Sequence, residues 1–229
     1  MLFSFEQFAT LNRWLGGLWR LILLNLMWTA VTLLGLGILG VGPASYALAA
    51  YLDGWMRDGR TPPVVRTFLD EARAQLGRSM VMGVLLVLAG AVIGVNLLSL
   101  SDWYLRAANH IALGVLLVIA AYVFFVMAAT ELRGLHRQIG GALLLGFGSL
   151  HWTLLGALAV AVGEAVMLRY ALALFPLLGA VLPAFVVALI LRPVLTDLAP
   201  QSARRTDATG RILTPSAPRA AHPMEGHSA

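Results

Sequence analysis

Cysteine is absent from this 229-residue chain, and so is lysine, because all sixteen basic residues are arginine. The lack of cysteine excludes disulfides, thiolate metal ligands and cysteine nucleophiles. Charged residues of either sign make up only 12% of the chain, whereas a soluble domain usually carries about 25%. So little charge cannot cover the surface of a soluble protein, which indicates that the chain is solvated by lipid.

Long apolar runs are what the sequence has instead. Hydrophobic residues make up 59% of the chain and the mean hydropathy is +0.83. The runs are near the length of about 20 residues that an α-helix needs to cross a hydrocarbon core about 30 Å thick. We therefore predict an all-α, polytopic transmembrane bundle of about five spans, at residues 21–40, 80–100, 111–129, 152–170 and 172–191.

Two segments near the first span are too short or too polar to cross the bilayer alone. Residues 1–15 place apolar side chains at helical spacing, which predicts a separate amphipathic helix at the interface. Glycines and Pro43 weaken the helix after the first span, so a turn should precede a helix over 44–56. We expect this helix to be re-entrant or interfacial, and a full crossing remains the open alternative.

Two further amphipathic helices are predicted between the spans. Thr61 and Pro62 provide an N-cap and a first-turn proline for a helix that runs to about Arg78. Its apolar face comprises Val64, Val65, Phe68, Leu69, Ala72 and Leu76. Residues 131–149 should contain a second short interfacial helix.

The composition changes abruptly near the C-terminal end of the sequence. Residues 200–229 are rich in Ala, Pro, Ser and Arg and have almost no large apolar side chains. Such a segment cannot bury enough apolar surface to offset the entropy of ordering it. We therefore expect a transmembrane domain over 1–195 and a disordered cytoplasmic tail over 196–229.

The distribution of arginine predicts an orientation for the bundle. With five spans, twelve arginines lie on one side of the membrane and four on the other: Arg13, Arg20, Arg106 and Arg169. Because cytoplasmic loops carry the excess of positive charge, the N-terminus should lie outside and the C-terminus in the cytoplasm. The arginines are scattered between apolar blocks and form no basic patch, so a nucleic-acid partner is not expected.

Three short patterns occur in the first third of the chain: the run 24–28 with Asn25 and Trp28, the sequence Gly42-Pro43-Ala44, and Phe68 in the amphipathic helix. Together they resemble the YesL family of bacterial membrane proteins. The resemblance covers roughly residues 15–195 and is densest over 25–78. That family was catalogued as a domain of unknown function.

The resemblance implies a multi-pass protein of the bacterial plasma membrane. Members of the YesL family often accompany ABC-type sugar transporters in bacterial genomes, which implies an accessory role in carbohydrate uptake and ABC-type sugar permease subunits as partners. No catalytic residue and no cofactor come with the resemblance. The expected partners are therefore the lipid bilayer and a permease, with a homo-oligomer as an open alternative.

Glu164 is the acidic residue that lies well inside a predicted span, where an unpaired carboxylate is costly. We expect it to pair with Arg169 or Arg20, and a proton or substrate role is the alternative. Asn25 and Asn96 lie within the first two spans, where an amide can join helices by hydrogen bonds. Packing is the favoured role for both.

The sequence lacks the patterns of a catalytic or metal site. Neither HxxxH nor HExxH occurs, and the glycine-rich tracts lack the ending of a phosphate-binding loop. We therefore expect no enzyme activity, no metal and no cofactor. A small transporter or channel that uses Glu164 is the alternative to an accessory protein.

Overall fold

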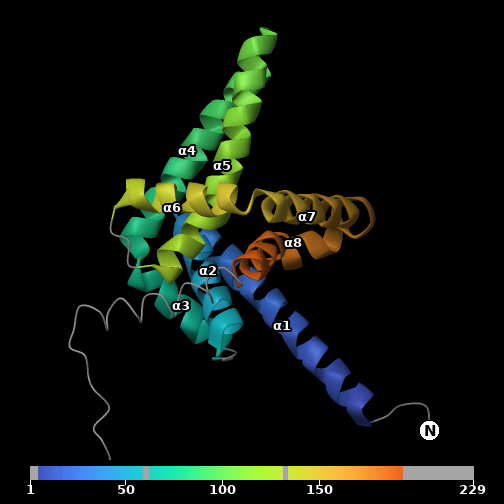
Figure 1. Cartoon of the computed structure of the whole chain (residues 1–229). Coiled ribbons are helices and arrows are strands. Elements are labelled where there is room, and N and C mark those ends of the chain that lie inside the picture. Colours follow the sequence, from blue (N-terminus) through green and yellow to red (C-terminus); the bar gives the residue numbers. More distant parts are fainter. Residues whose placement is uncertain (1–4, 59–61, 131–133, 193–229) are drawn as a thin grey trace, which may run out of the picture. The chain divides into compact units, whose positions relative to one another are not determined.

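The computed structural model describes residues 5–58, 62–130 and 134–192, which belong to one compact unit, Met1–Arg192. These residues form helices joined by short turns, and they contain no strand (Figure 1). The helices are α1 (Phe5–Leu34), α2 (Val41–Asp58), α3 (Val64–Ala74), α4 (Leu76–Ser99), α5 (Trp103–Ala129), α6 (Leu135–Gly148), α7 (Leu150–Tyr170), the 3₁₀ turn η1 (Leu172–Leu174) and α8 (Phe175–Leu178), followed by helical residues 181–192. The predicted all-α class is confirmed.

Five helical segments are long and apolar enough to cross a membrane, as predicted. They are Trp14–Leu34, Leu76–Ser99, Trp103–Ala129, Leu150–Tyr170 and Phe175–Arg192. The third begins eight residues earlier than expected. The side chain of Asp102 caps it by accepting a hydrogen bond from the backbone N–H of Leu105 at 3.1 Å, which extends the helix over polar residues that the prediction had left outside.

The predicted separate helix over 1–15 is wrong for the described residues. Helix α1 runs without a break from Phe5 to Leu34, so the amphipathic segment and the first span are one helix. No proline lies in this stretch, and glycine alone weakens a helix by only about 1 kcal/mol per residue. Residues 1–4 lie outside the described part.

The turn predicted near Gly42-Pro43 is present, but helix α1 ends at Leu34, six residues before the predicted end of the first span. The N–H of Gly37 donates to the carbonyl of Thr32 at 2.8 Å, and the N–H of Leu36 donates to Leu33 at 3.0 Å. This is the Schellman pattern of a helix C-terminus. Leu36 and Gly37 take positive φ angles of 55° and 79°.

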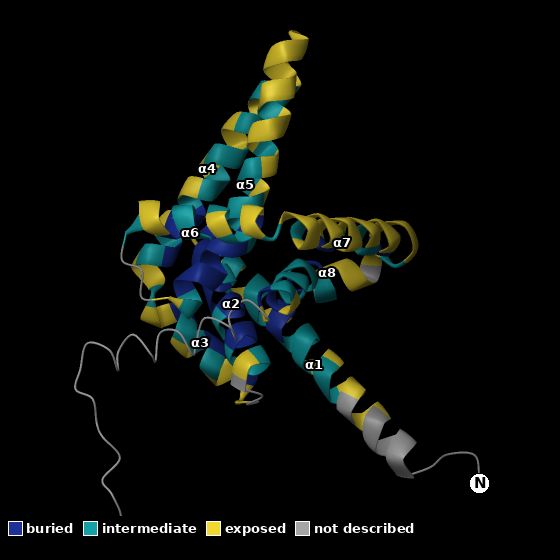
Figure 2. Ribbon diagram, in the orientation of Figure 1, coloured by how far each residue is buried: buried dark blue, intermediate teal, exposed yellow. Residues whose placement is uncertain are grey.

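Helix α2 is the most enclosed element of the fold. It contacts α1, α3, α4 and α5, and Figure 2 shows the buried residues concentrated on it and on the adjoining half of α5. Its buried side chains include Ala44, Tyr46, Ala47, Leu48, Ala49, Tyr51 and Leu52. Several alanines let the four neighbouring helices approach α2 closely.

The amphipathic helix before the second span is shorter than expected, and its buried face contains fewer residues. It begins after Pro63, not after Thr61, and ends at Ala74, so Arg78 belongs to α4. Val64, Phe68 and Ala72 are buried at spacings of four residues, which is one stripe of the helix. Val65 and Leu76, assigned to that face, are 43% and 51% exposed; Thr61 lies outside the described residues.

A short helix follows the third span, as predicted. Helix α6 packs against α5, and residues 131–133 before it are not described. The predicted tail, 196–229, lies entirely outside the described residues. Its disorder and its cytoplasmic location stay predictions.

Candidate functional site

A buried amide joins the first span to the last one. Asn25 is 2% exposed, and its Oδ1 accepts hydrogen bonds from the backbone N–H groups of Ala180 and Val181 at 3.0 and 2.9 Å. Its Nδ2 donates to the carbonyl of Pro176 at 2.7 Å. The last span is interrupted between α8 and residues 181–192, and Asn25 satisfies backbone groups that the interruption leaves without helical partners. It is a contact between distant parts of the sequence.

Helix α1 is tied to α2 one turn further along. The indole Nε1 of Trp28 donates to the hydroxyl of Ser45 at 3.1 Å, and both residues are half-buried. The two members of the 24–28 run singled out in the sequence therefore contact two different helices.

Helices α2 and α4 cross at two glycines. A Cβ atom on Gly42 would overlap the backbone of Ser79, and a Cβ atom on Gly83 would overlap Gly42 itself. Only residues without side chains allow so close an approach of two helix backbones. Pro43 and Ala44 are buried beside this crossing, and Phe68 of α3 is fully buried. The Gly42-Pro43-Ala44 pattern is thus the place where two helices meet.

Glu164 is not brought together with either arginine that was expected to neutralise it. It lies half-buried on α7, and within the described residues it makes no hydrogen bond or ion pair. Arg169 follows five residues later, which turns it about 140° around the helix axis and directs it away. Arg20 contacts α2 instead, with its guanidinium carbon 5.8 Å from the centre of the Trp55 ring.

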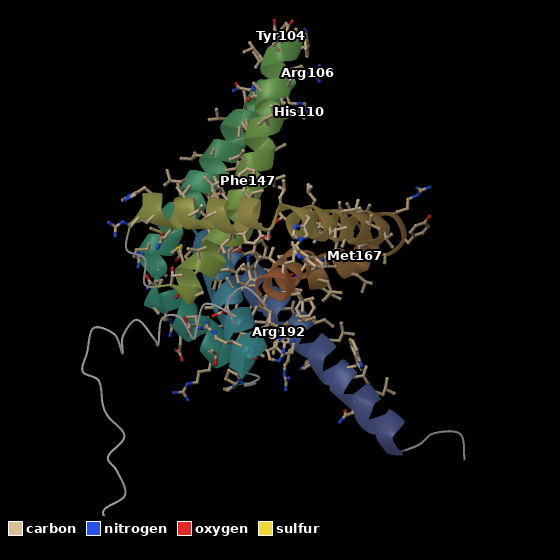
Figure 3. All side chains as sticks on the ribbon, in the orientation of Figure 1. Tyr104, Arg106, His110, Phe147, Met167 and Arg192 are labelled. Carbon is tan, nitrogen blue, oxygen red and sulfur yellow. The ribbon has the colours of Figure 1, made fainter. Side chains whose placement is uncertain are left out.

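Asn96 contacts the neighbouring span through a weak hydrogen bond. Its Nδ2 donates to Oδ1 of Asn109 on α5 across 3.4 Å, near the upper limit for such a bond. Asn109 also donates to the carbonyl of Leu105 at 2.8 Å. Figure 3 shows Tyr104, Arg106 and His110 along the first turns of the same helix, where all three are exposed.

Sequence reasoning missed a second polar contact between spans. The hydroxyl groups of Tyr122 and Thr153 lie 2.8 Å apart, and Thr153 also donates to the carbonyl of Gly146 at 3.0 Å. These groups link α5, α6 and the first turn of α7. The signal was available, because a tyrosine and a threonine inside long apolar runs need hydrogen-bond partners.

A charged cluster at the end of α2 was also missed. Asp53 is buried and forms an ion pair with Arg57 one turn later. The ring of Trp55 lies 6.4 Å from that of Phe185 in the last span, in addition to its contact with Arg20. The hydroxyl of Tyr51 donates to the carbonyl of Pro62 at 3.1 Å. This end of α2 therefore joins the first span, the last span and the connection to α3.

The described residues contain no group of three or more His, Asp or Glu side chains that could hold a metal ion. Several of their polar contacts join different helices, and they gather no nucleophile with a base. The Asn25 contact, the Gly42–Gly83 crossing and the cluster around Trp55 are the features that most distinguish the fold. All three involve α1, α2 or α4, and the Asn25 contact and the Trp55 cluster also reach the last span.

Comparison with known proteins identifies the same part of the chain. The family described as "Protein of unknown function, DUF624" matches residues 21–97, from the first span through most of α4. The uncharacterized protein YteU of Bacillus subtilis (strain 168) is 40% identical over 73 residues, which are 32% of this chain and 33% of YteU. The match thus spans about a third of that relative. No solved structure matches.

The matched residues include the first predicted pattern and the crossing glycines. Asn25, Trp28, Gly42 and Phe68 all lie within 21–97. The chain is therefore a helical membrane protein that is similar, over its first four helices, to an uncharacterised protein family.

Proposed function

We propose that this protein is a YesL-like, non-enzymatic accessory component of carbohydrate ABC transport in the bacterial plasma membrane. One observation carries the proposal. In the segment that resembles other proteins, the polar side chains of Asn25, Trp28 and Ser45 are engaged in contacts between helices. A segment of this kind provides a rigid packing unit rather than a reaction centre. The sugar association itself comes from the resemblance to the YesL family.

An outward stripe on α4 is the surface on which we propose that a helix of the permease docks. It consists of Val81, Leu85, Leu88, Val92 and Val95, which alternate at spacings of four and three residues and are each at least 46% exposed. That spacing places one continuous apolar stripe along a helix, the pattern by which helices pack side by side. Gly94 lies on the same helix, and a Cβ there would meet nothing within 4 Å.

A photocrosslinking experiment tests the accessory role. A benzoyl-phenylalanine residue is placed at Val92, and separately at Leu158 on α7 as a control of matched exposure, 61% against 62%. In native membranes that contain the sugar permease, we expect a permease adduct from Val92 and none from Leu158. Lipid adducts alone from both positions, with the permease present and intact, would contradict the proposal.

Glu164 favours a second candidate function, a small transporter. It is a half-buried carboxylate within a span and has no partner among the described residues. Such groups mark proton or ion pathways in transporters. The interruption of the last span at Gly179 and Ala180 adds a broken helix of the kind that transporters use.

Reconstitution into liposomes separates the two functions. A transporter should carry a proton-coupled flux that Glu164→Gln abolishes, because the amide cannot ionise. Asn96→Gln provides the control, since it keeps an amide on a different span. An accessory protein should show no flux above that of empty liposomes with either chain.

A further inference from the structure

Helices α1 and α2 form one antiparallel hairpin. Near the turn, a Cβ atom on Gly40 would lie 2.8 Å from the Cα atom of Thr32. Further along, Trp28 bonds Ser45, and further still Arg20 lies over Trp55. Each step towards the start of α1 is matched by a step towards the end of α2. The two helices therefore run side by side in opposite directions.

The start of the first span and the end of α2 consequently lie at the same level of the structure. The guanidinium carbon of Arg20 is 5.8 Å from the ring of Trp55, which precedes Arg57 by two residues. Arg57 opens the arginine-rich connection, 57–78, that leads to α4. An indole ring beside a guanidinium group is typical of the boundary between hydrocarbon and water. Both ends of the hairpin therefore belong to one membrane surface.

The length of the hairpin suits a bilayer. Eighteen residues in α2 make a helix about 27 Å long, close to the hydrocarbon thickness of about 30 Å. The turn at 35–40 contains only glycine, leucine and isoleucine. Helix α2 is shielded by four neighbours. Its buried polar residue Asp53 therefore faces protein rather than lipid.

With the hairpin, a larger share of the arginines lies on one surface of the membrane. The connection 57–78, the connection after α5 and the region from Arg192 onward hold five, two and five arginines. The hairpin adds Arg13 and Arg20 to the same side. Fourteen of the sixteen arginines then share one membrane surface, against twelve when the start of α1 is placed opposite.

We propose that α1 and α2 enter the membrane as a single hairpin, so that Arg20 and the part of α1 before it lie on the cytoplasmic side, as the arginine-rich connection does. This replaces the external N-terminus that the sequence analysis predicted, and it does not depend on the proposed function. The earlier prediction treated α2 as a segment that does not return the chain across the bilayer. The contact of Arg20 with Trp55 is incompatible with placing the two arginine groups on opposite surfaces.

Cysteine accessibility tests the hairpin directly, because the chain contains no thiol of its own. Single cysteines are introduced at Asn12, Ala74 and Ser101, which are all exposed. A membrane-impermeant maleimide is applied to intact bacterial cells and then to permeabilised cells. We expect S101C to react in intact cells, and N12C and A74C to react only after permeabilisation.

Two outcomes would overturn the proposal. Reaction of N12C together with S101C in intact cells would place the start of α1 on the outer surface. Reaction of N12C and A74C in intact cells, with S101C protected, would show that the shared surface is external.

A fusion experiment covers the case in which a cysteine variant fails to accumulate. Green fluorescent protein, which folds in the bacterial cytoplasm but not after Sec-dependent export, is fused before Met1 of the full chain. Alkaline phosphatase, which is active only outside the cytoplasm, is fused in a second version. We expect fluorescence without phosphatase activity, and the opposite pair of results would overturn the proposal.

Discussion

Helices α2 and α7 show opposite relations between hydrophobicity and burial. Helix α7 is apolar enough to span a membrane, yet only 6% of the residues in its most apolar stretch are buried within the protein. Helix α2 is not among the five apolar spans, yet most of its first thirteen residues are buried. Figure 2 shows the contrast between the two helices. Lipid tails are as apolar as leucine, so a leucine-rich helix needs no protein around it. A helix with Asp53 and two tyrosines needs hydrogen-bonding partners within the protein.

The two helices also differ in what holds them. Helix α2 meets α4 at Gly42 and Gly83, where backbones touch, and it meets α1 through a hydrogen bond from Trp28. Helix α7 meets the last span where a Cβ on Gly156 would overlap the side chain of Ile190, and its first turn bonds Tyr122 through Thr153. A mutation that forces two backbones apart should therefore lower the free energy of unfolding more than one that displaces only a side chain.

The largest expected effect comes from Gly42→Leu. Any side chain there would overlap the backbone of Ser79, so α2 and α4 must separate. Overpacking of this kind costs about 3 kcal/mol or more where no side chain can yield. We expect a large loss of folded protein in detergent, measured by thermal unfolding. Gly94→Leu is the control, because a Cβ there meets no atom within 4 Å; equal losses from both would refute the crossing.

Asn25→Leu should have the next largest effect. It would leave the N–H groups of Ala180 and Val181 and the carbonyl of Pro176 without their present partner. A buried group left unsatisfied costs about 1–3 kcal/mol. We expect a lower unfolding temperature and faster proteolysis near the interruption of the last span. Unchanged stability and an unchanged cleavage pattern would mean that Asn25 does not hold the two spans together.

Asn96→Leu should have a smaller effect than Asn25→Leu, although both replace an amide inside a span. Asn96 makes one long hydrogen bond, 3.4 Å, to Asn109 near the exposed ends of α4 and α5. Its loss should cost less than about 1 kcal/mol, because water and lipid headgroups can replace the partner. The same unfolding measurement checks the order. A larger drop in unfolding temperature for Asn96→Leu than for Asn25→Leu would contradict this order.

The smallest effect, and the opposite sign, is expected at the turn after α1. Leu36 has a φ of 55°, a conformation that costs a residue with a Cβ about 1 kcal/mol. Leu36→Gly should therefore stabilise the protein by a few tenths of a kcal/mol to about 1 kcal/mol. Leu34→Gly, at the equally exposed last residue of α1, where φ is not positive, should destabilise it by up to about 1 kcal/mol. Destabilisation by both would show that the turn does not require the left-handed conformation.

Features that depend on local pattern were predictable. The length of the apolar runs, set by the 1.5 Å rise of a helix, identified all five spans, and the glycine-rich stretch before Pro43 marked a turn. The buried stripe of Val64, Phe68 and Ala72 followed from helical periodicity. Errors arose at helix ends, where Asp102 and Pro63 cap helices at positions that hydropathy does not reveal.

Features that depend on which helices meet were not predictable. Asn25 was identified as a packing residue, but its partners lie more than 150 residues away along the chain. The predicted pairing of Glu164 with Arg169 or Arg20 failed because Arg169 is turned around the helix and Arg20 packs on Trp55. The hydropathy of a segment does not indicate which distant residue its side chains will contact.

The sequence by itself determined that this is an all-α membrane protein with five apolar spans, because bilayer thickness and charge content constrain any chain of this composition. Only the tertiary structure decided that the weakly apolar α2 occupies the centre, that glycines mark its crossing with α4, and that α1 returns through it as a hairpin. The reason is physical. Lipid satisfies apolar side chains wherever they lie, whereas polar groups and close backbone contacts require particular partners.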